Sequence, residues 1–123
     1  MSSEVFVRGT LKKVDTKGKT TEEYVTDLLV ETKEGFDSMS DFDKEMEVDE
    51  YIYENYVTLG GELWEWVSKK KSYDTTEYYC ELTENGDGTI GVVTQFYDGG
   101  TCEKEMIEEE YDRRIARGES FGK

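Results

Sequence analysis

Carboxylates are the side chains of this chain that could do chemistry, because Asp and Glu make up 30 of its 123 residues while His is absent. Without His there is no Ser-His or Cys-His pair, no imidazole base and no imidazole metal ligand. A carboxylate pair could still cleave a glycosidic bond. In so acidic a chain, however, a pair at a useful spacing arises by chance. We therefore expect a protein that is not an enzyme.

A short acidic run resembles part of a calcium-binding loop. Asp41, Asp43 and Glu45 have the alternating spacing of its first three ligands. The pattern then fails, because Met46 stands where such a loop needs Gly, and Ile52 stands where it needs Glu. An acidic helix start explains the run better, since the helix dipole favours carboxylates there. We expect neither a metal ion nor a cofactor.

The two cysteines, Cys80 and Cys102, cannot form a structural zinc site by themselves. The N-terminal segment lacks the apolar region of a secretory signal, and no stretch approaches the roughly 20 apolar residues of a membrane span. These features predict a cytoplasmic protein with reduced thiols, a disulfide between them being the alternative. Gly86-Asp87-Gly88 leads into a predicted strand, which indicates a turn and not a phosphate-binding loop.

The net charge of −15 is concentrated in two blocks. Residues 21–62 carry −12 and residues 81–112 carry −9, whereas the margins 1–20 and 113–123 carry +3 each. Such a surface repels nucleic acids and anionic membranes and attracts basic proteins.

Two rows of acidic side chains carry the sharpest functional hypothesis. Carboxylates at i, i+3 and i+4 of a helix have Cβ atoms about 5–6 Å apart. Those at i and i+2 of a strand lie roughly 6.5–7 Å apart, and either spacing can imitate a row of backbone phosphates. Within the second row, Glu108–Glu110 is a run with no compensating base. The alternative is a solvated face that serves solubility. The first row is Asp41, Asp43, Glu45, Glu47, Asp49, Glu50 and Glu54, and the second is Glu103, Glu105, Glu108, Glu109, Glu110 and Asp112.

Trp64 and Trp66 would point to the same side of a strand. One interpretation is that they pack in the core. The other is that they form an exposed aromatic anchor for a partner, because Trp and Tyr are favoured at interfaces. The same argument applies with less force to Tyr51, Tyr53 and Tyr56.

Residues 21–33 fit two local structures. As a helix, they follow Thr20 and Glu23 in capping-box spacing. As a strand, they show β-branched and aromatic residues alternating over 24–32. A short internal similarity favours the strand, which is our prediction: residues 11–13 and 20–24 resemble 69–71 and 75–78, and both sets could be strand–turn–strand units.

Two helices are predicted elsewhere in the chain. Ser40 and Asp43 have capping-box spacing, which indicates a short central helix over residues 38–47. Residues 48–59 alternate in a way that suits a strand but remain ambiguous. An amphipathic helix is predicted over 101–117, where Ile107, Tyr111 and Ile115 repeat at i, i+4 and i+8.

The chain is predicted to be a single α+β domain over residues 1–123, with 119–123 as a flexible tail. Its antiparallel β-sheet would have about five or six strands, covered on one face by the C-terminal helix. Nine Tyr, five Phe and two Trp would supply much of the core. The clearer strands are predicted over residues 4–14, 62–68, 75–83 and 89–97, the last two joined by a hairpin turn.

These features predict a small acidic protein that binds a basic protein partner. In its most concrete form it inhibits a nucleic-acid-processing protein, such as a nuclease or a restriction or CRISPR effector, by presenting carboxylates in place of phosphates. The proline-free composition, rich in Tyr, Asp, Glu and Lys, resembles in style that of phage-encoded counter-defence proteins, which would act in the host cytoplasm. The expected partner-binding residues are Asp41, Asp43, Glu45, Glu47, Asp49, Glu50, Glu108, Glu109, Glu110 and Asp112.

Two alternatives stay open at this point. The first is an immunity-type inhibitor of a basic toxin, in which an acidic surface likewise binds a basic one. The second is a small-molecule or nucleotide binder with an aromatic pocket around Trp64, Trp66, Tyr78 and Tyr97. In either case an edge strand could pair two copies into a homodimer.

Overall fold

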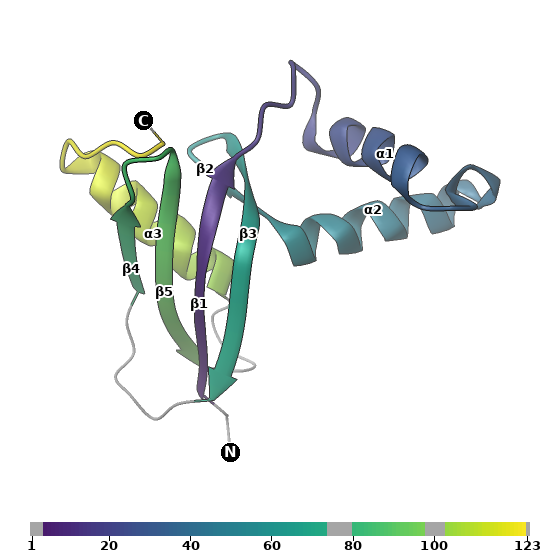
Figure 1. Ribbon diagram of the computed structural model, residues 1–123. Helices are drawn as coiled ribbons and strands as arrows, with labels where there is room; N and C mark the ends of the chain where they lie inside the picture. The colour runs from purple at the N-terminus through teal and green to yellow at the C-terminus, as the bar shows by residue number, and fades with distance from the viewer. Residues whose placement is uncertain (1–3, 74–79, 98–102, 123) are drawn as a thin grey trace.

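The computed structural model describes residues 4–73, 80–97 and 103–122, which form an α+β fold (Figure 1). In chain order the elements are β1 (Glu4–Lys13), α1 (Thr21–Thr32), the short 3₁₀ helix η1 (Phe36–Ser38), α2 (Asp41–Asn55), β2 (Tyr56–Leu59), β3 (Glu62–Tyr73), β4 (Cys80–Glu84), β5 (Thr89–Tyr97) and α3 (Glu103–Ala116). The strands form one sheet in the order β2-β3-β1-β5-β4, and all neighbours are antiparallel. The predicted fold class is confirmed.

The central strand β1 pairs with β3 and β5, and a bulge interrupts its pairing with β3. Thr10 is paired with Ser68 and Leu11 with Trp66, so Val67 has no partner opposite it. Gly9 lies beside this bulge, and a Cβ there would come within 2.2 Å of the Ser68 carbonyl oxygen. Only glycine lets β3 approach β1 this closely.

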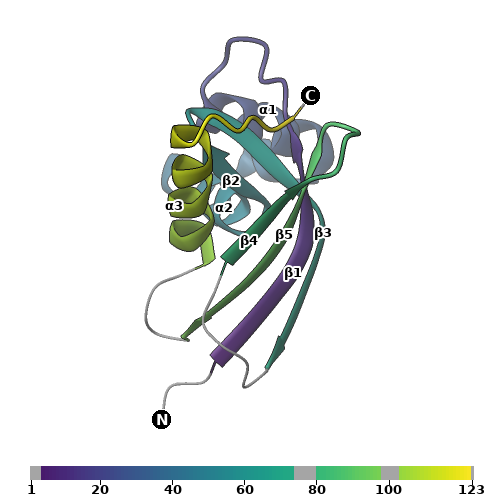
Figure 2. The ribbon, with the colours of Figure 1, turned by 90° about the vertical axis from the view of Figure 1, so that its left-hand side faces the viewer.

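The helices lie on different sides of the sheet. α3 runs along one face, while α1 and α2 form a helical hairpin that extends beyond the β2–β3 side (Figures 1 and 2). The two larger core clusters follow this division. Leu63 packs with Val25 and Val48 of the hairpin, whereas Trp64 packs with Ile107 of α3. Because successive strand residues point to opposite faces, β3 contributes residues to both clusters, one on each face of the sheet.

The strand predicted over residues 21–33 is wrong, because this segment is helix α1. Its capping box is complete: the Thr20 hydroxyl accepts from the Glu23 N–H at 3.1 Å, and the Glu23 carboxylate accepts from the Thr20 N–H at 3.2 Å. Val25 and Leu29, four residues apart, are buried against α2. Packing of this face outweighs the β propensity of the alternating residues. In the similar segment at 69–78, residues 69–73 continue β3, and 74–78 lie outside the described residues.

The predicted central helix has the expected cap at Ser40, but it begins at Asp41, three residues later than predicted, and continues past residue 47. The Ser40 hydroxyl caps it by accepting from the Asp43 N–H at 3.2 Å. Val48 is buried and Ile52, four residues later, is half-buried, so the helical period extends into the ambiguous segment. Residues 48–59 therefore divide between α2 and β2, and β2 turns into β3 through Gly60 and Gly61, both with positive φ.

The other strands lie where they were predicted, and β5 has the predicted ends, whereas β1, β3 and β4 end at different residues. β3 extends to Tyr73, and the β4–β5 hairpin turns at residues 85–88 with Gly86 and Gly88 at positive φ. The part of the predicted strand 75–83 that precedes Cys80 lies outside the described residues.

The predicted C-terminal helix is confirmed as α3, although residues 101 and 102 lie outside the described range. Ile107 is fully buried, but Ile115 is 41% exposed, so the apolar face does not extend to the helix end as predicted. In the segment predicted as a tail, Phe121 is 7% exposed, and its ring lies 5.6 Å from that of Tyr111. Every helix in the described residues is too short or too polar to cross a bilayer.

Candidate binding surface

The α1–α2 hairpin, residues 21–55, contains thirteen acidic and two basic residues. We call it the acidic hairpin. It extends away from the rest of the fold (Figure 1), so it presents most of its surface to solvent. Its charge of −11 makes it the main source of the negative potential of the molecule.

Most of the first predicted acidic row lies on the exposed surface of α2. Val48, Tyr51 and Ile52 turn toward the hairpin core, and this orientation places six carboxylates in solvent. None of the six forms an ion pair with a described residue. They are Asp41, Asp43, Glu45, Asp49, Glu50 and Glu54.

Glu47 differs from the other members of this row. It is half-buried and forms an ion pair with Lys33, which joins the end of α1 to α2. This contact gives Glu47 a structural role inside the hairpin, and its carboxylate is not free to imitate a phosphate.

The exposed carboxylates of α2 make the helix repel itself. Asp41 and Glu45 are four residues apart, as are Glu45 and Asp49, and Glu50 and Glu54. Each like-charge pair at this spacing costs about 0.2–0.5 kcal/mol. The last turn contains no basic residue, so Glu50 and Glu54 also oppose the helix dipole. The dipole favours Asp41 and Asp43 in the first turn, but helix stability does not explain Glu45, Asp49, Glu50 and Glu54.

The second predicted row is divided by the packing of α3. Glu105, Glu109 and Asp112 are exposed and spaced i, i+4 and i+7 on the outward face. Glu108 is half-buried, and burial raises the pKa of its carboxyl above the ordinary value, an effect that Lys104 opposes. The side chain of Glu103 lies outside the described residues.

Glu110 has two basic partners, so the prediction that Glu108–Glu110 lacks a compensating base is wrong. Its carboxylate lies 2.8 Å from Arg113 and 3.5 Å from Arg117, and its side chain is only 13% exposed. Glu110 therefore stabilises the end of α3 and does not belong to the exposed row. The i, i+3 spacing of Glu110 and Arg113 is a signal that could have identified this pair from the sequence.

The tryptophans are part of the core and not an exposed anchor. Trp64 is fully buried beneath α3, and Trp66 is partly buried against the same cluster. The indole N–H groups of both are buried without a hydrogen-bond partner among the described residues. Trp64 therefore has no surface to offer a partner or a small molecule. Tyr78 and the side chain of Tyr97, which complete the predicted aromatic pocket, lie outside the described residues.

Three apolar side chains lie on the exposed side of α2, of which Phe42 and Met46 were missed as candidate functional residues, whereas Tyr53 was considered as a weaker aromatic anchor. Phe42, Met46 and Tyr53 are 69%, 56% and 62% exposed. The i, i+4 spacing of Phe42 and Met46 is typical of a helix, but it does not reveal whether they point to the core or to solvent. Their position relative to buried Val48 on the helix is the signal that separates them from core residues.

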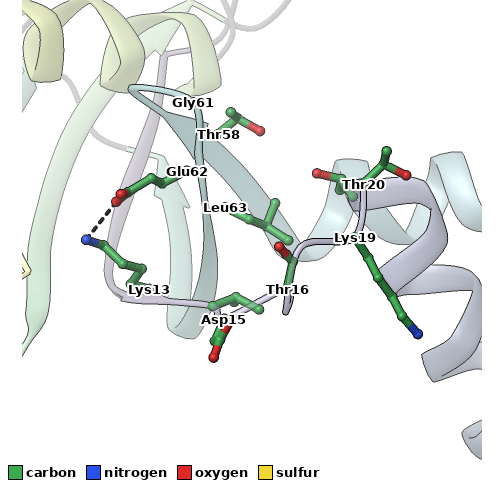
Figure 3. Close-up of a pocket in the computed structure, with 11 residues that line it drawn as sticks. Lys13, Asp15, Thr16, Lys19, Thr20, Thr58, Gly61, Glu62 and Leu63 are labelled. Atoms are coloured by element: carbon green, nitrogen blue, oxygen red, sulfur yellow. Dashed lines mark ion pairs between the residues drawn. The ribbon is translucent and has the colours of Figure 1, made fainter.

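A pocket of about 550 Å³ opens between the β1–α1 loop, the start of α1 and the β2–β3 turn (Figure 3). It contains two lysines that could bind an anion, but both have acidic partners: Lys13 lies 2.7 Å from Glu62, and Lys19 is paired with Asp27. The Thr20 hydroxyl is occupied by the capping box. The pocket therefore provides little support for a nucleotide site.

Among the described residues, no group of three potential metal ligands is close enough to hold an ion. Asp41, Asp43 and Glu45 lie at the start of helix α2 and not in a loop, and at this spacing they do not all point in the same direction. The candidate site is thus a surface of carboxylates and apolar side chains, suited to binding a macromolecule.

No protein-family model, curated protein or solved structure matches the chain.

Proposed function

We propose that this protein is a non-enzymatic inhibitor that binds a basic surface of a nucleic-acid-processing protein through the exposed carboxylates of α2 in the acidic hairpin. The observation that carries the proposal is the set of six exposed carboxylates on α2 that form no ion pair with a described residue, four of which lie beyond the first turn and are present despite their cost to the helix. Solubility requires charge on a surface but does not require it to be concentrated on one self-repelling helix.

The spacing of these carboxylates suits a groove that binds nucleic acid. Neighbouring turns of α2 place carboxylates with Cβ atoms about 5–6 Å apart. Over its 15 residues the helix is about 22 Å long, so it can reach several Lys or Arg side chains that would otherwise hold phosphates. A groove that attracts DNA or RNA would attract the hairpin for the same electrostatic reason.

Charge reversal on α2 tests this proposal. A protein captured at low salt and identified by mass spectrometry would be assayed for nucleic-acid binding in the presence of wild type and of the variant Glu45→Lys/Asp49→Lys/Glu50→Lys. We expect this variant to lose inhibition, since each charge-assisted contact is worth about 1.5–3 kcal/mol.

Two variants with the same change in charge serve as controls. Glu31→Lys/Glu34→Lys/Glu81→Lys changes exposed acids away from the outward face of α2, and Glu105→Lys/Glu109→Lys/Asp112→Lys changes the exposed row of α3. Equal loss of inhibition in all three variants would mean that total charge matters and that α2 is not the binding surface. Unchanged inhibition in all three would overturn the proposal.

The immunity-type alternative uses the same surface and is separated by the identity of the captured protein, a toxin in place of a nucleic-acid-processing protein. The aromatic-pocket alternative has less support, because Trp64 is buried.

A further inference from the structure

The outward face of α2 exposes three large apolar side chains in the most acidic part of the molecule. Phe42, Met46 and Tyr53 account for three of the six large hydrophobic residues that are exposed in the described chain. Single exposed apolar residues are normal on a soluble protein. Their gathering on one helix, in a chain with few apolar residues to spare for its core, is the feature that needs an explanation.

These side chains form a line on α2. At 3.6 residues per turn, positions 42, 46 and 53 fall within about 40° of each other around the helix, and Asp49 falls in the same line. The buried Val48 lies on the other side. We call Phe42, Met46, Asp49 and Tyr53 the α2 stripe, which is about 16 Å long at 1.5 Å per residue.

The stripe lies on a helix that is capped at its start and contacts α3 at its end. Ser40 caps the start of α2, directly before Phe42. At the other end, the Lys104 ammonium group donates to the Ile52 carbonyl oxygen at 3.2 Å and lies 4.9 Å from the ring centroid of Tyr53. Lys104 at the start of α3 thus contacts the end of α2 beside Tyr53.

Charge decides which kind of surface can cover the stripe. Glu45 and Glu50 flank it, Asp49 lies within it, and none of the three has a basic partner among the described residues. A second copy of this chain would bring the same acids to the contact, and an anionic membrane would be repelled. A basic protein surface would pair with the flanking acids while covering the apolar residues.

We propose that the α2 stripe docks into a cationic groove of a partner protein, where apolar pockets receive Phe42 and Met46. This inference rests on the proposed function and deepens it, because it makes the contact apolar as well as electrostatic. Aromatic residues that fill pockets at the centre of an interface dominate its energy, while charges around them direct the approach and orientation.

Two synthetic helical peptides are the probes that test the stripe. Both have the same flanking arginines, and they differ only in a central seam of leucines or of alanines. Fluorescence anisotropy would measure their binding to the full-length protein. We expect the leucine peptide to bind about tenfold tighter or more, because only its seam can bury the stripe.

Three protein variants separate the apolar from the electrostatic contribution. Phe42→Ser/Met46→Ser should remove the preference for the leucine peptide. Val30→Ser/Val67→Ser, which changes exposed apolar residues elsewhere, should retain it. Glu45→Lys/Glu50→Lys should weaken both peptides. Circular dichroism would establish that each variant is folded.

The outcomes distinguish the two proposals. Equal affinity for both peptides, or equal effects of the two serine variants, would overturn the docking of the stripe and leave the electrostatic function intact. If Glu45→Lys/Glu50→Lys binds both peptides as wild type does, the proposed function fails as well.

Discussion

At the scale of single residues, Gly9 shows how closely the central strands approach. A Cβ at this position would come within 2.2 Å of the Ser68 carbonyl oxygen and within 2.8 Å of the Trp66 ring. We expect Gly9→Ala to lower the free energy of unfolding by about 2 kcal/mol or more, because backbone and a packed ring must move. Gly91→Ala is a matched control, since its nearest contact is the Asn85 side chain at 3.4 Å. Urea unfolding would compare them, and equal losses would contradict the close approach at Gly9.

The Cys80 thiol is the second residue with a specific expectation. Burial raises its pKa from 9.0 to about 11, partly offset by a hydrogen bond with Thr94. In a Cys102→Ser variant, a thiol-reactive disulfide reagent at pH 8 should label Cys80 about tenfold or more slower in the folded protein than in urea, because only the thiolate reacts. Similar rates in both states would mean that Cys80 is exposed.

The same shift in pKa affects stability at high pH. Above pH 9.0 the unfolded chain ionises Cys80, while the folded chain keeps it protonated until about pH 11. The stabilising contribution of this group is therefore fully present below pH 9 and is lost as the pH rises through that range.

At the scale of elements, α3 depends on the face that it buries. Ile107→Asp places an unpaired charge in the core and should lower the free energy of unfolding by about 3 kcal/mol or more. Ile115→Asp, at a position that is 41% exposed, should cost less than about 1 kcal/mol. Thermal unfolding followed by circular dichroism would compare the two variants. Comparable losses would show that the packing face of α3 is assigned incorrectly.

Local sequence signals predicted the elements whose propensity and packing agree. The β4–β5 turn and the start of α2 follow from Gly86, Gly88 and Ser40, whose conformations depend on near neighbours. α1 was assigned wrongly because its capping box and its β-like alternation conflict. The deciding contacts, Val25 and Leu29 against α2, come from a distant segment.

The candidate surface was predictable in composition but not in detail. The acidic rows are visible in the sequence, yet burial and pairing select among their members. Glu47 does not belong to the free carboxylates because it pairs with Lys33, fourteen residues away, and no local sequence pattern indicates this pair. Phe42 and Met46 have the spacing of core residues, and only the packing of Val48 shows that they face solvent.

At the scale of the whole molecule, charge should make stability depend on salt. A net charge of −15 repels itself in the compact state. Raising NaCl from about 20 to about 500 mM shortens the Debye length from roughly 20 to 4 Å. We expect the melting temperature to rise by about 4 °C or more, which corresponds to about 1 kcal/mol. A fall would mean that ion pairs such as Lys13–Glu62 outweigh the repulsion.

The division of the core by β3 has a consequence for motion. Most of the repulsive charge belongs to the hairpin, whose cluster around Val25 and Val48 is separate from the one under α3. The hairpin can therefore open as a cooperative unit of its own, while the sheet and α3 stay closed. Amide hydrogen exchange should be faster in α1 and α2 than in β1 and β5, and more so at low salt. A partner that neutralises the charge of the hairpin would then slow amide exchange throughout it. Binding would therefore raise the free energy of opening of the segment that makes the contact.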